Sequence, residues 1–303
     1  MLDKILHKLF MQIPSYKERY NDHNNLRNKM EFPPGHYYSP CVTMDELREF
    51  ENIIWRQKEI NEISAIDFNA EAQKDFLKAL KKNFGNLRLV EKPTANNRYY
   101  LDNGFYSYTD GIILSLMISH LQPKRIIEVG SGYSSALMLD LNDQLFKSEI
   151  ELTFIEPYTE RLDALIERSE NRNTQIIRKK VQEIDLSIVE KLESNDILFI
   201  DSSHVSKVGS DLNFIVFEIL PKLRPGVFIH FHDIFYPFEY PKEWIKQGKS
   251  WNEIYILRSF LMYNNEFRIK LFADYLHKKH PQIFSEIPLC YKNTGGNLWL
   301  EKL

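Results

Sequence analysis

The spacing of hydrophobic and polar positions changes near residue 100. Before it, apolar residues recur every three or four positions, as one buried face of a helix requires, at residues 2–13, 43–54 and 69–80. After it, apolar runs of strand length lie at residues 125–129, 152–156, 175–181, 197–201 and 227–232. Helical patterns separate these runs, at residues 133–146, 159–170, 184–192 and 209–223. Strands that alternate with helices in this way are typical of repeated βαβ units, which form a parallel sheet between helices.

This change of spacing predicts two parts of the chain. Residues 1–100 form a helical N-terminal extension or lid, and residues 101–303 form one α/β domain. Thr43 and Glu46 match a capping box that opens the second helix of the extension. The apolar stripe over residues 2–13 suits a helix docked on its own domain or on a second copy in a homodimer. A membrane-surface helix is disfavoured because few lysines line the polar face.

Composition and charge narrow the class of protein. The 39 basic and 42 acidic residues nearly balance, and no basic arm exists, so we expect no nucleic-acid partner. Two cysteines cannot build a disulfide framework and favour a reducing compartment. The longest apolar stretch, residues 111–121, is too short to span a bilayer. With no apolar core of a signal peptide at the N-terminus, we expect a cytoplasmic protein.

The first predicted strand runs through a glycine loop into a helix. The sequence there is Glu128-Val-Gly130-Ser-Gly132-Tyr-Ser-Ser135, and such glycines let the backbone turn tightly and approach a ligand closely. Ser135 replaces the third glycine of the dinucleotide fingerprint. Glu128 would repel a pyrophosphate but suits a ligand that carries an ammonium and a sulfonium. Glu156, at the end of the second strand, can accept hydrogen bonds from both hydroxyls of a ribose.

Residues 128–135 resemble motif I of the class I S-adenosylmethionine-dependent methyltransferases, and Glu156 resembles the acid that closes their second strand. The resemblance covers about residues 100–303, including the segments 196–204, 223–233 and 295–300. It points to bacterial small-molecule O-methyltransferases related to the macrolide-sugar and catechol-type enzymes. It implies a Rossmann-like α/β fold with a seven-stranded sheet of order 3-2-1-4-5-7-6, in which strand 7 is antiparallel.

The same resemblance implies S-adenosyl-L-methionine as the cofactor. The residues that it assigns to cofactor binding are Glu128, Gly130, Ser131, Gly132, Tyr133, Ser134, Glu156 and Asp201. Tyr106 and Asp110 are further candidates near the methionine end, because the segment that holds them precedes the helix leading into the first strand.

Acidic and histidine residues follow the fourth and fifth strands. Asp201 ends the fourth strand and His232-Asp233 end the fifth, so they meet at the carboxyl edge where open α/β sheets bind ligands. The catechol-type relatives hold a divalent cation there, and Asp201 and Asp233 match two of its ligand positions. His232 replaces the oxygen ligand expected at the third, so the candidate metal ligands are Asp201, His232 and Asp233. A histidine ligand admits Mn²⁺, Fe²⁺ or Zn²⁺ as well as Mg²⁺. The alternative is a metal-free site in which His204 or His232 is the general base.

The sequence therefore predicts transfer of a methyl group from S-adenosylmethionine to a hydroxyl of a small molecule, such as a sugar or secondary metabolite. Asp201, His204 and His232 are the candidate catalytic residues. Two alternatives remain open, a non-catalytic Rossmann-type binding or scaffold protein and an NAD-dependent oxidoreductase. The acid–histidine cluster argues against the first alternative, and Ser135 with Glu128 argues against the second.

Overall fold

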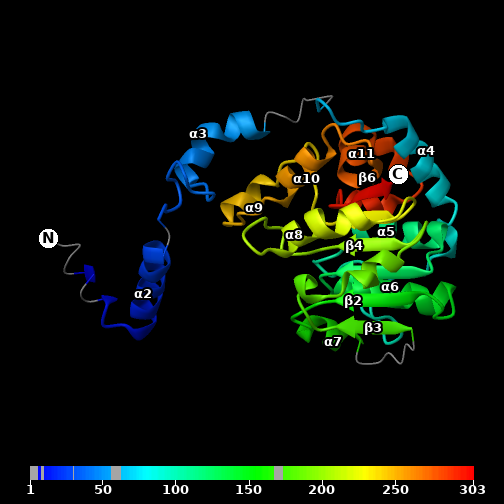
Figure 1. Ribbon diagram of the computed structural model, residues 1–303, viewed down its shortest axis with the longest axis horizontal. Coiled ribbons are helices and arrows are strands. Elements are labelled where there is room, and N and C mark those ends of the chain that lie inside the picture. Colours follow the sequence, from blue (N-terminus) through cyan, green and yellow to red (C-terminus); the bar gives the residue numbers. More distant parts are fainter. Residues whose placement is uncertain (1–5, 8–9, 30, 56–62, 167–172) are drawn as a thin grey trace. The chain divides into compact units, whose positions relative to one another are not determined.

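The computed structural model describes residues 6–7, 10–29, 31–55, 63–166 and 173–303 (Figure 1). Its sheet has seven strands in the order β3-β2-β1-β4-β5-β7-β6, as predicted. The strands are β1 Arg125–Val129, β2 Glu151–Ile155, β3 Thr174–Ile177, β4 Ile197–Ile200, β5 Phe228–Phe231, β6 Phe267–Phe272 and β7 Leu298–Lys302. Strands β1 to β5 pair in parallel, and β7 runs antiparallel to both β5 and β6. The predicted fold class is confirmed.

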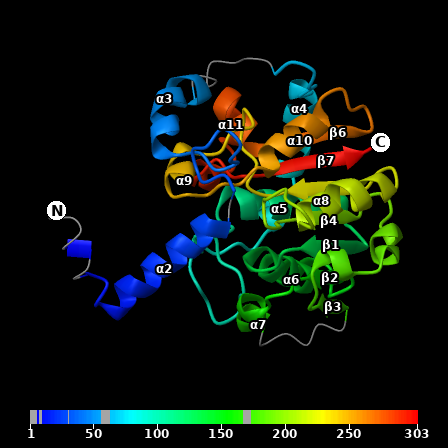
Figure 2. The ribbon, with the colours of Figure 1, turned by 60° about the vertical axis from the view of Figure 1, so that its left-hand side comes forward.

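The central strands are apolar because protein covers both of their faces. Every residue of β4 and of β5 is buried, which suits parallel strands between layers of helices. Figure 2 shows β4, β1, β2 and β3 stacked in this order. The carboxyl ends of β1, β2, β4 and β5 therefore meet along one edge of the sheet.

Helices flank this sheet. The helices that precede or alternate with the parallel strands are α4 Ala70–Lys81, α5 Thr109–Leu121, α6 Tyr133–Leu145, α7 Glu160–Ile166 and α8 Asp211–Phe214. Those after β5 are α9 Lys242–Lys246, α10 Glu253–Leu261 and α11 Ala273–Lys279. Helices α4, α5, α6 and α7 contact one another in series, whereas α8 contacts the 3-10 turn η3, Val181–Glu183. Helix α5 is apolar on all sides and is buried almost throughout.

Two predicted helices differ in kind from the expectation. Residues 186–191 form the 3-10 turn η4, Leu186–Lys191, instead of an α-helix. The pattern over residues 209–223 becomes α8, then a π-helical turn over Ile215–Ile219 and a 3-10 turn over Leu220–Lys222. Pro221 lacks the N–H that a continuing α-helix would use, which accounts for the irregular end.

The chain divides into two compact units. One holds residues 1–56 with 245–250, and the other holds residues 57–244 with 251–303 and contains the whole sheet. The first unit includes α2 Pro14–Lys29 and α3 Met44–Ile54, and Thr43 with Glu46 forms the predicted capping box at the start of α3. The expected helix over residues 2–13 lies partly outside the described residues. The domain boundary at residue 100 and the homodimer stay predictions.

Among the described residues, no helix is both long enough and apolar enough to cross a membrane.

Candidate functional site

The glycine loop after β1 passes directly over the end of β4. Gly130 has a φ of +83°, and a Cβ added there would lie 1.8 Å from the carbonyl oxygen of Asp201. Only glycine fits both this conformation and this approach. Gly132 has extended backbone, and its added Cβ would meet nothing nearer than Cδ of Arg161, at 3.4 Å. The two glycines therefore have different roles, since Gly130 is required by the fold itself.

Serines of the loop and of α6 enclose Glu128. The carboxylate is fully buried on β1 and accepts hydrogen bonds from Ser134 Oγ, at 2.5 Å, and from Ser135 Oγ. The Ser135 hydroxyl also accepts the N–H of Gly132, at 3.0 Å. Ser135, in the place of the third fingerprint glycine, thus joins the loop to the start of α6. Burial raises the pKa of Glu128 to about 8, although both serine hydrogen bonds act in the opposite direction.

We expect the Glu128→Gln variant to be more stable than the wild type at alkaline pH. The folded protein holds the Glu128 proton up to about pH 8, whereas the unfolded chain releases it near its ordinary value of 4.5. Wild-type stability from this group is complete at low pH and is lost as the pH rises toward 8. The difference in melting temperature between variant and wild type should grow by about 6 °C between pH 5 and pH 8. A difference that does not change with pH would show that Glu128 stays charged in the fold.

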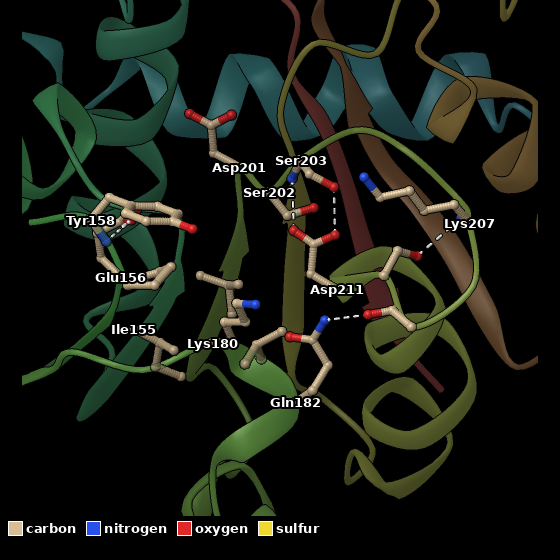
Figure 3. Close-up of a pocket in the computed structure, with 16 residues that line it drawn as sticks. Ile155, Glu156, Tyr158, Lys180, Gln182, Asp201, Ser202, Ser203, Lys207 and Asp211 are labelled. Carbon is tan, nitrogen blue, oxygen red and sulfur yellow. Dashed lines mark hydrogen bonds between the residues drawn. The ribbon is translucent and has the colours of Figure 1, made fainter. Parts of the chain in front are cut away.

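A cavity of about 450 Å³ opens beside this loop, along the ends of β1, β2 and β4. Figure 3 shows Glu156 and Tyr158 on one side of it and Lys207 and Asp211 on the other. Glu156 accepts the backbone N–H of Ser131, at 3.0 Å, and that of Tyr158, at 2.7 Å. This carboxylate therefore fixes the glycine loop to the end of β2. The volume lies within the range of small-molecule and cofactor sites.

Two residues of the cavity wall hold buried polar atoms without a partner. Gln182 Oε1 and Ser202 Oγ both belong to residues that line the cavity, and both are buried without a hydrogen-bond partner among the described residues. Buried polar groups are normally satisfied, so these two atoms are unusual. The Ser131 side chain, in the glycine loop, interacts with the Glu128 carboxylate and lowers its pKa. Gln182 carries no local sequence signal, because it lies on η3 and reaches the cavity only through the fold.

The predicted catalytic residues meet at the carboxyl ends of β4 and β5. His204 Nε2 lies 3.4 Å from Asp201 Oδ1 and 3.8 Å from Asp233 Oδ2. His232 Nε2 lies 3.4 Å from Asp233 Oδ1, and its Nδ1 lies 4.0 Å from Asp110 Oδ1. Asp201 also lines the cavity beside the glycine loop. The cluster and the cavity are therefore parts of one site.

The acidic and histidine side chains of this cluster shift one another's pKa values. Burial disfavours the cation of His204, but hydrogen bonds to Asp201 and Glu253 outweigh it and raise the pKa of the imidazole well above 6.5. Burial likewise opposes the carboxylate of Asp201, yet His232 and His204 bring its pKa below the ordinary value. The pKa of His232 is raised because the nearby aspartates outweigh its burial. The carboxylates around them thus make both imidazoles stronger bases than a free histidine.

Tyr106 and Asp110 form the wall behind the cluster. Asp110 Oδ1 accepts the N–H of Gly296, at 2.8 Å, and the side-chain amide of Asn297, at 2.7 Å. Burial raises its pKa to about 6. The Tyr106 ring is buried with its centroid 4.9 Å from that of His232. Both residues lie at the acid–histidine cluster, and the cofactor contacts predicted for them remain a prediction.

Tyr133, at the start of α6, belongs to an aromatic stack above the glycine loop. Its ring stacks on Phe105 with centroids 5.6 Å apart, and the Arg161 guanidinium lies over the Phe105 ring, 4.2 Å from its centroid. Phe105 is largely exposed. The stack places a cation and two rings at the loop, where the sequence predicts cofactor binding by Tyr133.

His230 is a core residue. It is fully buried, its ring stacks on Phe199 with centroids 4.1 Å apart, and it lies 4.7 Å from the Trp299 ring. Neither ring nitrogen has a hydrogen-bond partner among the described residues. Burial holds its pKa well below 6.5, so this histidine is neutral and takes no part in the charged cluster.

The described residues do not fit a metal ion in this arrangement. No three of their His, Cys, Asp and Glu side chains are placed so that they could hold one. His204 Nε2, within 4 Å of both Asp201 and Asp233, lies between the two carboxylates that a cation would need. The predicted metal site of Asp201, His232 and Asp233 stays a prediction that this donor set does not support.

Comparisons with known proteins agree with the fold and the glycine loop. A family model described as a methyltransferase domain matches residues 127–234, from β1 to just beyond β5. An uncharacterized protein of Archaeoglobus fulgidus is 34% identical over 202 residues, which cover 65% of this chain and 90% of that protein.

Two solved structures illustrate the similarity in fold. The S-adenosylhomocysteine-bound methyltransferase PaMTH1 of Podospora anserina is 12% identical, with a TM-score of 0.43, and the match covers 86% of this chain and 98% of that one. An O-methyltransferase of Bacillus cereus in complex with S-adenosylhomocysteine is 17% identical, with a TM-score of 0.37, covering 73% and 90%.

The family-model match spans the glycine loop, the acid that ends β2 and the acid–histidine cluster. The strand order, with its antiparallel β7 between β5 and β6, is the one that the resemblance implies. The chain belongs to the class I S-adenosylmethionine-dependent methyltransferases.

Proposed function

We propose that this protein transfers a methyl group from S-adenosylmethionine to a hydroxyl of a small molecule, such as a sugar or secondary metabolite. One observation carries the proposal: Asp201 lines the cofactor cavity and also lies 3.4 Å from His204 Nε2. A histidine that can accept a proton is thereby placed next to the cavity of the methyl donor.

Residues of the cavity supply the contacts that the cofactor needs. Glu156 is placed to accept the ribose hydroxyls, and Asp201 to attract the ammonium or sulfonium. The unpartnered Gln182 Oε1 and Ser202 Oγ suit the hydrogen-bonding groups of a nucleoside. Glu128 accepts a hydrogen bond from Ser134 Oγ, and this pair supports the glycine loop. The cofactor lies over the backbone of Gly130, Ser131 and Gly132.

When bound, S-adenosylmethionine supplies an electrophilic methyl group on a sulfonium that is a good leaving group. The chain itself must then position the acceptor and remove the proton of its hydroxyl, whose free pKa is far above 7. We assign His204 as the general base that accepts this proton. Asp201 and Asp233 lie beside its Nε2. His232 lies on the other side of Asp233, with its Nε2 3.4 Å from Asp233 Oδ1.

A labelled-methyl transfer screen tests this function. The protein is incubated with labelled S-adenosylmethionine and a collection of hydroxylated metabolites, and products are detected by mass spectrometry. Methyl transfer to an oxygen supports the proposal. Binding of S-adenosylhomocysteine without turnover on any acceptor would favour the scaffold alternative, and nicotinamide binding in a fluorescence titration would favour the oxidoreductase.

Removal of divalent cations is expected to change the methyl-transfer rate by less than about twofold. The described cluster offers no set of three ligands, and a histidine nitrogen lies between Asp201 and Asp233. The rate is measured after exhaustive treatment with EDTA, and again after addition of Mg²⁺, Mn²⁺, Fe²⁺ or Zn²⁺. A rate lost on chelation and restored by one of these cations would instead support the metal-assisted mechanism predicted from the sequence.

A further inference from the structure

The segment that opens α10 holds the loop after β4 in place. The backbone N–H groups of Asn252 and Glu253 both donate to the carbonyl oxygen of His204, at 3.0 and 3.1 Å. The Asn252 side chain accepts the N–H of Ser206 and donates to its carbonyl oxygen, at 2.6 and 3.2 Å. The Trp251 ring lies on that of His204, with centroids 4.3 Å apart. Three consecutive residues therefore fix both the backbone and the ring plane of His204.

Glu253 makes the closest side-chain contact with this histidine. Its Oε2 lies 2.7 Å from His204 Nδ1, and the Glu253 side chain is 1% exposed. His204 has a φ of +59°, an uncommon conformation for a residue other than glycine. Such conformations persist where the surrounding structure enforces them, and they cluster at functional sites. The contacts of α10 are the surroundings that enforce this one.

A carboxylate bonded to one ring nitrogen decides what the other nitrogen can do. A carboxylate can only accept a hydrogen bond, so the pairing of Glu253 with Nδ1 favours the tautomer that carries its proton on Nδ1 and leaves Nε2 to exchange a proton. Nε2 lies 3.4 Å from Oδ1 of Asp201, which lines the cavity, and 3.8 Å from Asp233 Oδ2. His232 lacks this support, since its Nδ1 has no hydrogen-bond partner among the described residues and Asp110 is 4.0 Å away. This contrast separates the two histidines that the sequence leaves as alternatives.

We propose that Glu253 is the positioning residue of a Glu253–His204 dyad, which keeps the His204 proton on Nδ1 and aims Nε2 at the acceptor hydroxyl. The proposal rests on the proposed methyl transfer, which makes His204 the base. Glu253 is not one of the residues that line the cavity, and it acts through His204.

Glu253→Gln is the informative variant, because glutamine keeps the size and one acceptor oxygen but removes the charge. We expect kcat to fall about 10- to 100-fold, as for other orienting partners of histidine, while the affinity for S-adenosylhomocysteine changes less than twofold. In a His204→Gln background the same change should have no further effect on kcat. Glu239→Gln is the matched control, since Glu239 bonds Tyr255 of the same helix but not His204, and it should keep wild-type kcat.

Two results would overturn the proposal. One is a wild-type kcat in Glu253→Gln. The other is an equal loss of kcat and of cofactor affinity, which would make Glu253 a support of the whole site. Should Glu253→Gln fold poorly by circular dichroism, the wild-type protein still provides the test. Its ¹⁵N spectrum of ring nitrogens, recorded at an alkaline pH where the imidazole is neutral and with His204 assigned by comparison with His204→Gln, should show a protonated Nδ1, and an Nδ1 without its proton would reject the dyad.

The spectrum also separates this proposal from the function on which it rests. If no acceptor is methylated but His204 shows a protonated Nδ1, the dyad stands and the hydroxyl acceptor is wrong. If methyl transfer occurs but Nδ1 carries no proton, the function stands and the dyad is wrong.

Discussion

Gly130→Ala is expected to lower the free energy of unfolding by about 2–5 kcal/mol, the sum of a left-handed backbone and a steric overlap. The φ of +83° disfavours any side chain, and the new Cβ would overlap the backbone carbonyl of Asp201. This neighbour is backbone of β4's end, so it cannot rotate away. Binding of S-adenosylhomocysteine should be lost as well, because the loop and Asp201 cannot both keep their places.

The control for this prediction is Gly132→Ala. Its backbone is extended, and the nearest atom to the added Cβ is the flexible Arg161 side chain. We expect the stability to change by less than about 1 kcal/mol, as for a substitution compatible with its backbone. Urea unfolding of both variants measures the difference. Equal stability of the two variants would mean that the loop can move away from β4.

Glu156→Ala is expected to weaken the binding of S-adenosylhomocysteine about 100-fold or more. The carboxylate fixes the N–H groups of Ser131 and Tyr158 and, as proposed, also holds the ribose. Each hydrogen bond to a charged group contributes about 1.5–3 kcal/mol, so the loss of two corresponds to at least a hundredfold in affinity. Isothermal titration calorimetry at constant pH and salt gives the affinity.

Glu156→Gln serves as the comparison, because it keeps an acceptor oxygen and should lose less affinity than the alanine variant. Melting curves without ligand show whether the glycine loop still folds. Undiminished binding by Glu156→Ala would remove Glu156 from the site and leave the cavity without its assigned ribose acceptor.

Local chemistry made part of this site predictable from the sequence. Gly130 is needed for a positive φ, and an acid at the end of β2 follows directly from the strand pattern, so both could be found without the fold. The strand runs predicted the parallel part of the sheet because buried parallel strands are apolar throughout. The exact strand order and the antiparallel β7 came from the family resemblance.

Helix type was less predictable where a side chain bonds the neighbouring backbone. Residues 186–191 have a helical pattern but form a 3-10 turn, in which the Asp185 side chain bonds the N–H of Ser187. A side chain that bonds the nearby backbone competes with the helical ladder. The spacing of apolar residues alone cannot distinguish an α-helix from a 3-10 turn.

By itself the sequence determined the glycine loop, the two strand-end acids and the edge of the sheet where His204 and His232 meet, because each follows from a short stretch of chain. Only the tertiary structure brought Glu253 to His204 across 49 positions and placed Gln182 in the cavity wall. It also put a histidine nitrogen between Asp201 and Asp233. These contacts join distant segments, and no local period or spacing records them; they depend on how helices and turns pack against the completed sheet.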